Sequence, residues 1–229
     1  MYKAILRPFF FLFDPEKIHH FVFKLIRFSN AIPGVAAINK KIFGIEDKKL
    51  ERELFGLKFK NPVGIAAGFD KNAVLINQLE NYGFGFIEIG TATPKPQDGN
   101  PKPRMFRLKE DEALINRMGF NNPGSLAVRD SLLERRSKGQ WPNNPIAANI
   151  GRSKKVSNDD APNDYASTLD ILWDFSDLFV LNVSSPNTPG LRELQGEEHL
   201  SKVLEACNNI RDRKQDFKPI LLKFSPDME

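Results

Sequence analysis

Five short apolar segments alternate with helix-like segments along most of this 229-residue chain. Each of these segments is continuously apolar, which is typical of strands that are buried on both faces of a parallel sheet. We predict strands at residues 62–66, 86–90, 146–150, 178–182 and 220–224, and helices at 72–82, 161–174 and around 200–210. This order predicts an α/β fold in which helices cover a parallel sheet.

Polar side chains lie at or just beyond the carboxyl ends of the predicted strands. They are Lys71, Thr91, Asn149, Asn182 and Lys223. That end carries the active site of a (β/α)8 barrel, and a doubly wound open sheet binds ligands there too. Residues 83–88 lack the third glycine of the dinucleotide-binding fingerprint and precede a strand instead of following one, which favours the barrel.

The first 44 residues differ from the rest in charge and composition. They hold seven of the Lys and Arg residues against two acidic ones, and eight of the nineteen phenylalanines, so the remainder of the chain is nearly neutral. That distribution argues against nucleic-acid binding, which needs a basic stripe across the folded domain. We predict two helices here, the second capped by Asp14 and starting at Pro15. They either pack on the body or lie in a membrane interface, with Phe buried and Lys and Arg at the headgroups.

Two loop regions concentrate groups that can bind small polar ligands. Residues 92–145 are predicted to be mostly loop, with a short hairpin at 105–108 and 113–116, and insertions of this length are usually functional. The second loop places Ser184 and Ser185 between Asn182 and Asn187, and it contains Pro186 and Pro189. It can present amide donors and a hydroxyl to a ligand, although Ser and Asn before Pro are also ordinary turn residues.

Taken together, these segments resemble the dihydroorotate dehydrogenases, specifically the membrane-associated, quinone-dependent class. The matching stretches follow the order of that family and are residues 66–71, 88–97, 116–121, 149–151 and 182–192. Serine at the catalytic loop position and an N-terminal helical extension are features of that class. The resemblance implies an FMN-binding TIM barrel at residues 45–229, preceded by a two-helix extension at residues 1–44 that forms a membrane-facing quinone tunnel.

The implied reaction is the oxidation of (S)-dihydroorotate to orotate in pyrimidine biosynthesis, with FMN as the hydride acceptor and a quinone as the final electron acceptor. Ser185 is the implied catalytic base. The substrate-binding residues that the resemblance implies are Lys71, Asn116, Arg117, Met118, Gly119, Phe120, Asn182 and Asn187. The flavin-binding residues that it implies are Ala67, Gly68, Lys71, Thr91, Asn149, Asn182 and Lys223.

The same resemblance extends to the quinone and the membrane. His19 and Arg107 match positions of the quinone site, and the N-terminal helices would hold the protein peripherally on the cytoplasmic side of the inner membrane. No metal site is predicted. Because a (β/α)8 barrel takes roughly 250 residues and only five strands are predicted, we expect the chain to lack the last three βα units. The alternatives are a soluble flavoenzyme of the same type with another acceptor, and an inactive barrel fragment.

Overall fold

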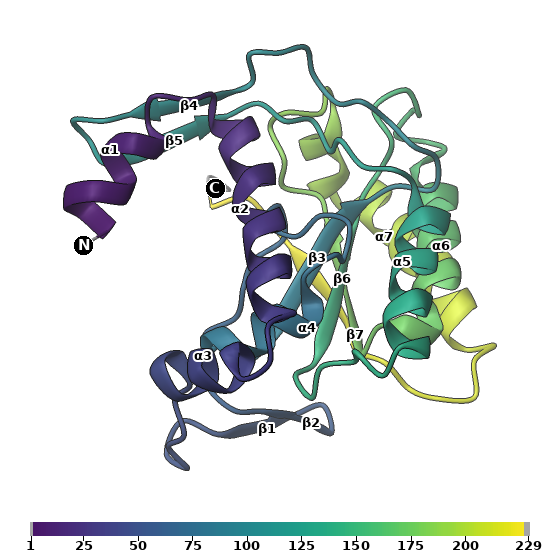
Figure 1. Cartoon of the computed structure of the whole chain (residues 1–229). Coiled ribbons are helices and arrows are strands. Elements are labelled where there is room, and N and C mark those ends of the chain that lie inside the picture. The colour runs from purple at the N-terminus through teal and green to yellow at the C-terminus, as the bar shows by residue number, and fades with distance from the viewer. Residues whose placement is uncertain (1, 227–229) are drawn as a thin grey trace.

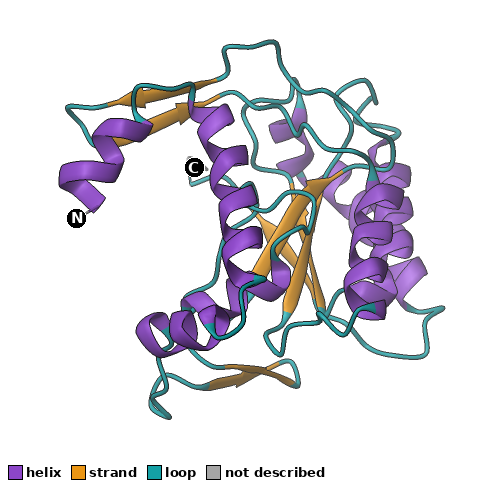
Figure 2. Ribbon diagram, viewed as in Figure 1, coloured by secondary structure: helices purple, strands orange, loops and turns teal. Residues whose placement is uncertain are grey.

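Four parallel strands form the centre of the computed structural model, which describes residues 2–226. Their order across the sheet is β3 (Ile87–Ala92), β6 (Ile146–Ile150), β7 (Leu178–Asn182) and β8 (Ile220–Lys223). The register sets Gly90 beside Asn149 and Asn182 beside Lys223, so the carboxyl ends of the strands lie together. The predicted parallel sheet is confirmed. Within residues 2–226 it forms an open part of a barrel (Figure 1, Figure 2).

The strand predicted at residues 62–66 is not formed. Within the described chain, one bridge from Ile65 to Ile87 is all that pairs this segment with β3. This bridge consists of two hydrogen bonds, from Ile65 N to Phe86 O (3.1 Å) and from Glu88 N to Ile65 O (2.9 Å). Pro62 has no N–H to donate, and beyond Ile65 the chain turns into a loop, so the ladder stops there.

Three helices lie along one side of the sheet, namely α5 (Ser125–Ser137), α6 (Ala161–Leu172) and α7 (Glu197–Arg211) (Figure 1). Helices α6 and α7 confirm the prediction, and 3-10 turns follow α6 at Trp173–Phe175 and precede α7 at Leu191–Gln195. Helix α5 lies in a region predicted to be loop. Its buried positions include Val128, Leu132 and Arg135, a helical spacing that the charged residues between them obscured.

The helix predicted at 72–82 is shorter than expected. It consists of α4 (Ile76–Leu79) and a 3-10 turn (Glu80–Tyr82). The buried carboxylate of Asp70 accepts hydrogen bonds from Val74 N (2.9 Å) and Leu75 N (2.7 Å). These two amides are thereby satisfied outside a helix, which explains the later start.

Two antiparallel hairpins flank the sheet. The strands β4 (Met105–Leu108) and β5 (Ala113–Asn116) form the predicted hairpin. The strands β1 (Arg52–Leu54) and β2 (Leu57–Phe59) form a second hairpin that was not predicted. Each of its strands has three residues, too few to show an alternating pattern in the sequence.

The N-terminal segment contains one helix more than predicted. A π-helical turn (Tyr2–Leu6) leads into α1 (Arg7–Phe10), which is followed by α2 (Pro15–Asn30) and α3 (Val35–Phe43). Helix α2 begins where predicted, because Asp14 Oδ1 accepts a hydrogen bond from Lys17 N at 2.9 Å. The ring of Phe23 on α2 packs against Phe69 of the body, with a centroid distance of 5.1 Å.

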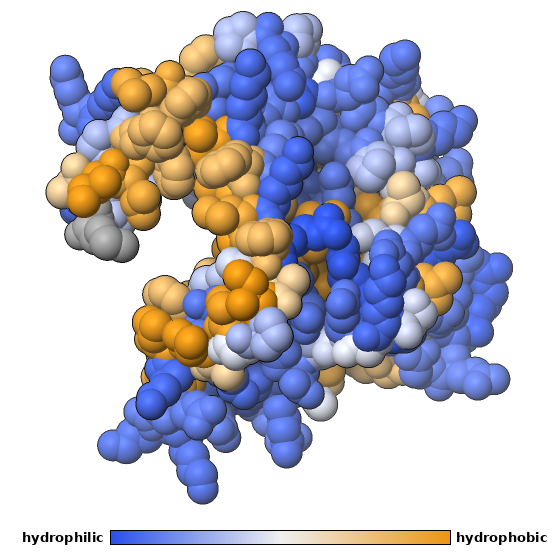
Figure 3. Space-filling model, in the orientation of Figure 1, coloured by the Kyte–Doolittle hydropathy of each residue, from blue (hydrophilic) through white to orange (hydrophobic). Residues whose placement is uncertain are grey.

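Many large apolar side chains of these helices are exposed. They include Ile5, Phe9, Leu12, Phe13, Phe21, Leu25, Phe28, Ile38 and Ile42. Figure 3 shows apolar side chains gathered around a hollow that opens between α1 and α3. Among residues 2–226, no helix taken singly has the length and apolar character needed to cross a bilayer. Helices α2 and α3 have that length and apolar character only when taken together, and the pair is bent by 112°.

The core lies between the sheet and α6. Tyr165, Leu169 and Trp173 are fully buried with Phe179 of β7, and the rings of Trp173 and Phe179 stack with centroids 5.4 Å apart. Tyr165 Oη donates a hydrogen bond to Asn182 O at 2.8 Å. The packing of α6 therefore holds the carboxyl end of β7, where the predicted site lies.

Candidate active site

Three predicted residues form one hydrogen-bonded row at the carboxyl ends of neighbouring strands. The Thr91 hydroxyl, on β3, donates to Asn149 Oδ1 of β6 at 2.5 Å. The Asn182 amide, on β7, donates to both Asn149 Oδ1 and Thr91 Oγ1 at 3.2 Å. All three side chains are buried, so their positions are fixed by one another and by the strand register.

Glu88 joins this row to Lys223 and was not predicted. Its buried carboxylate accepts hydrogen bonds from Asn149 Nδ2 (2.6 Å) and Ala67 N (3.0 Å), and from Lys223 Nζ, which lies 3.2 and 3.3 Å from the two oxygens. Glu88 therefore orients three residues that were predicted to bind a flavin. The signal in the sequence was a single charged residue inside an otherwise apolar strand.

Residues 67–71 form a loop that borders a cavity. Gly68 has a φ of +101° with open space where a side chain would lie, and its N–H donates to Gly90 O at 2.9 Å. Lys71 Nζ donates to Asn121 Oδ1 at 2.5 Å. Burial, together with the nearby charge of Arg104, lowers the pKa of Lys71 to about 8, and the charge of Glu16 opposes this change. The cavity has a volume of about 110 Å³, and Gly68 and Lys71 line it.

The serine loop is held by hydrogen bonds to its backbone. Arg192 Nε donates to Ser184 O (3.1 Å), Asn100 Nδ2 to Asn187 O (3.2 Å) and Arg152 Nη2 to Pro189 O (2.5 Å). The Ser184 hydroxyl donates to Asn182 Oδ1 at 3.0 Å, which ties the loop to the row at the strand ends.

The Ser185 hydroxyl is half-buried, and its oxygen accepts a hydrogen bond from Asn187 N at 3.3 Å. This long hydrogen bond uses only a lone pair of the oxygen and leaves the hydroxyl proton available for another partner. Ser185 thus lies in a rigid loop, three residues beyond the row that ends at Asn182.

The predicted substrate-binding segment 116–120 lies against the serine loop. Asn187 Nδ2 donates to Asn116 O at 3.3 Å, and Met118 lines the cavity beside Lys71. Gly119 and Phe120 both have positive φ, of +71° and +53°. Their carbonyl oxygens accept hydrogen bonds from the side chain of Gln97.

Arg117 differs from its neighbours in that segment. Its guanidinium donates to Pro103 O at 2.9 and 3.2 Å and lies over the ring of Phe106. Its side chain is therefore held by Pro103 and by Phe106 of β4.

The two predicted quinone-site residues occupy different surroundings. His19 lines the cavity, where its ring packs 4.2 Å from Phe23, and burial lowers its pKa. Arg107 is not among the residues that line this cavity. Its guanidinium donates to Phe13 O at 2.7 Å and lies 4.4 Å from the centroid of the Phe11 ring.

A parallel α/β sheet with a polar cluster at the carboxyl ends of its strands is the arrangement of the (β/α)-barrel enzymes, although doubly wound sheets share it. The family model for dihydroorotate dehydrogenase matches residues 49–229. The chain belongs to the dihydroorotate dehydrogenase family.

Known relatives agree with this assignment. The chain is 52% identical to the dihydroorotate dehydrogenase (quinone) of Christiangramia forsetii over 228 residues, which are 100% of this chain and 65% of that protein. It is 41% identical to the protein of the same name from Deinococcus deserti, again over 100% of this chain and 63% of the relative. The crystal structure of Eimeria tenella DHODH in complex with ferulenol superposes with a TM-score of 0.79 at 34% identity, covering 94% of this chain and 61% of that one. The chain thus spans slightly less than two thirds of the length of these relatives.

Proposed function

We propose that this chain oxidises (S)-dihydroorotate to orotate in pyrimidine biosynthesis, with FMN as the hydride acceptor and a quinone as the final electron acceptor. The observation that carries the proposal is the attachment of the serine loop, through Ser184 and Asn182, to the row of polar side chains at the strand ends. The names of the relatives at 41–52% identity support the substrate and the acceptor.

The donors at the strand ends fit a flavin. Asn149 Nδ2 and Lys223 Nζ each have a proton beyond those shared with Glu88, so they can donate from the strand ends beside Thr91 and Asn182 to a flat ring edged with carbonyl and nitrogen acceptors. The open space in front of Gly68 lets such a ring approach the backbone closely. FMN, when bound, supplies the acceptor for the hydride that leaves C6 of the substrate.

Ser185 is the proposed base in this reaction. It would remove the proton from C5, and the C5–C6 double bond of orotate forms as the C6 hydride departs. A serine hydroxyl is a weak base in water, so it needs a partner that takes up the proton and donors that stabilise negative charge on the substrate. Lys71, Asn116 and Asn187 are the proposed donors.

Mixing the purified chain with FMN and then adding dihydroorotate without an acceptor tests the function. We expect the flavin absorbance near its visible maximum to bleach and orotate to accumulate in equal amount. A quinone should restore the colour faster than fumarate or a nicotinamide, which separates the proposal from a soluble flavoenzyme with another acceptor. FMN binding without bleaching would favour the inactive-fragment alternative and reject the proposal.

The pH dependence of orotate binding should follow Lys71. Because its pKa is about 8, the cation is present below that pH and is lost above it. An anionic ligand held by this cation is then expected to bind about ten-fold more weakly for each further pH unit. Titrating orotate into the FMN-loaded chain from pH 7 to 9.5 measures this, with Lys71→Arg as the control that stays charged. Equal declines in parent and variant would assign the effect to another group.

We further propose that the N-terminal helices attach the protein peripherally to the cytoplasmic side of the inner membrane. Phe9, Phe13 and Phe21 are 54%, 48% and 52% exposed beside basic residues of the same segment. Apolar side chains next to Lys and Arg are the combination that binds an anionic lipid surface. His19 and Arg107 remain the proposed contacts of the quinone.

Replacing Phe9, Phe13 and Phe21 together by serine should weaken binding to anionic lipid vesicles about ten-fold or more, since each buried Phe contributes roughly 1.5–3 kcal/mol. Phe217→Ser is the matched control, because Phe217 is 70% exposed but lies near the end of α7. Co-sedimentation with vesicles measures both. Equal sedimentation of the triple variant and the parent would contradict the proposed attachment.

A further inference from the structure

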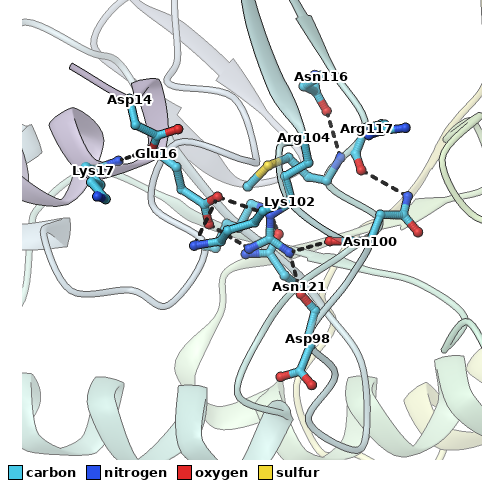
Figure 4. Close-up of polar contacts among 12 residues, drawn as sticks. Asp14, Glu16, Lys17, Asp98, Asn100, Lys102, Arg104, Asn116, Arg117 and Asn121 are labelled. Carbon is cyan, nitrogen blue, oxygen red and sulfur yellow. Dashed lines mark hydrogen bonds and ion pairs between the residues drawn. The ribbon is translucent and has the colours of Figure 1, made fainter. Parts of the chain in front are cut away.

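A buried ion pair joins the N-terminal helix α2 to the loop before β4. Arg104 Nη2 donates to Glu16 Oε1 at 2.6 Å and Arg104 Nε donates to Glu16 Oε2 at 3.2 Å (Figure 4). The two side chains are 8% and 9% exposed. The hydrogen bond and charge of Arg104 hold the pKa of Glu16 below its ordinary value, so the pair stays ionised. Such two-pronged geometry fixes orientation as well as distance.

Arg104 also organises the loop on its other side. Its Nη1 donates to Asp98 O (2.5 Å) and Asn100 O (3.1 Å), and its own carbonyl oxygen accepts from Arg117 N at 2.9 Å (Figure 4). One guanidinium therefore fixes residues 98–100 relative to α2 and aligns the chain that enters the predicted substrate-binding segment.

Asn100 extends these contacts to the serine loop. Its N–H donates to Met118 O at 3.0 Å, and its side-chain amide donates to Arg117 O at 2.9 Å and Asn187 O at 3.2 Å. A continuous series of hydrogen bonds thus leads from Glu16 on α2 through Arg104 and Asn100 to both segments that face the proposed substrate.

Helix α2 has few other buried contacts. Among its residues, all of which the structure describes, Glu16 and Phe23 are the two that are buried. Lys102 also approaches the Glu16 carboxylate, at 3.5 Å, but its side chain is 67% exposed. Glu16 is therefore the buried polar group of α2 that links the position of this helix to the loop before β4.

We propose that Glu16 and Arg104 are positioning residues that couple the seating of helix α2 to the conformation of residues 98–121, and thereby to substrate binding. The identity of the substrate rests on the proposed function; the coupling of helix to loop does not. Without Glu16 a buried guanidinium lacks its counter-ion, and the loop must open to let water reach it. The loop then no longer holds Asn100 and Met118 in place.

The test uses the full chain with Glu16→Gln, and with Lys102→Gln as the matched control that removes the exposed charge near the same carboxylate. We expect Glu16→Gln to speed hydrogen–deuterium exchange in residues 98–121 about ten-fold or more, while α6 and α7 keep the exchange rates of the parent. Lys102→Gln should match the parent throughout. Parent-like exchange in residues 98–121 of Glu16→Gln would overturn the coupling.

Kinetics separate positioning from simple structural support. In flavin reduction, Glu16→Gln should raise KM for dihydroorotate about five-fold or more. The kcat should change less than about two-fold, because Ser185 is untouched. A merely structural role lowers the fraction of active protein, which lowers kcat and leaves KM unchanged, and that result would also reject the proposal.

A double-mutant cycle with Arg104→Gln tests that the two residues act together. The rise in KM for the double variant should not exceed the rise for Arg104→Gln alone. Additive effects on KM would show that the two residues act independently. If Glu16→Gln unfolds the chain, Glu16→Asp keeps the charge and shortens its reach, and exchange in residues 98–121 is again read against α7. A parent that binds no orotate would refute the proposed function alone, and the exchange measurement would still decide the coupling.

Discussion

Replacing Ser185 by alanine is expected to slow the reduction of FMN by dihydroorotate about 10²- to 10⁴-fold, the range that a positioned general base contributes. The loop should keep its shape, because its backbone is held by Arg192, Asn100 and Arg152 and Ser185 Oγ only accepts one long hydrogen bond from Asn187 N. FMN binding is therefore expected to stay within about two-fold of the parent. Stopped-flow absorbance measures the reduction step, and flavin fluorescence measures binding.

Ser184→Ala is the matched control for this experiment. The Ser184 hydroxyl donates its proton to Asn182 Oδ1, an amide oxygen that does not take up that proton, so Ser184 orients the row at the strand ends and is not placed to act as the base. Its loss should slow reduction about ten-fold at most, the effect of one neutral hydrogen bond. Equal losses in the two variants would remove Ser185 from the role of base.

Phe179→Ala should lower the free energy of unfolding by about 3–5 kcal/mol, as large-to-small substitutions of buried aromatic residues do. Phe179 is fully buried in β7, stacks on Trp173 and lies between Ala148 and Ile220 in the register, so no neighbour is free to fill the space. Because domains are stable by only about 5–15 kcal/mol, this change alone brings the chain close to unfolding.

Urea denaturation followed by tryptophan fluorescence, which reports on Trp141 and the buried Trp173, measures this effect. Phe217→Ala is the control, since Phe217 is 70% exposed and its loss should change stability by less than about 0.5 kcal/mol. A shift in the midpoint without a change in slope is expected for Phe179→Ala. A midpoint equal to that of the control would mean that this part of the core repacks.

Strands β6, β7 and β8 and the hairpin of β4 and β5 were predicted correctly because their signals are local. Continuous apolar runs bounded by polar residues identify buried strands, and the carboxyl-end rule then brings Thr91, Asn149 and Asn182 together without knowledge of any other contact.

The features that were missed depend on contacts between distant segments. Residues 62–66 have the composition of a strand, but whether they pair is decided by the neighbouring chain. The partners Glu16 and Arg104 are 88 positions apart, and Glu88 and Lys223 are 135 apart, so no spacing rule connects them. Helix α5 was missed for a different reason, since its apolar stripe is narrow and interrupted by charged residues.

The ion pair between Glu16 and Arg104 has a practical consequence for how the protein can be divided. Residues 1–44 carry many exposed apolar side chains, so removing them is the obvious way to make the protein easier to handle. Such a truncation also removes the counter-ion of Arg104 and the ring of Phe23 that covers Phe69. Substrate affinities measured on a truncated form therefore describe a body whose charge balance has been altered. The N-terminal helices supply a charge that balances a buried guanidinium of the body, so the two parts cannot be separated without a change in the body.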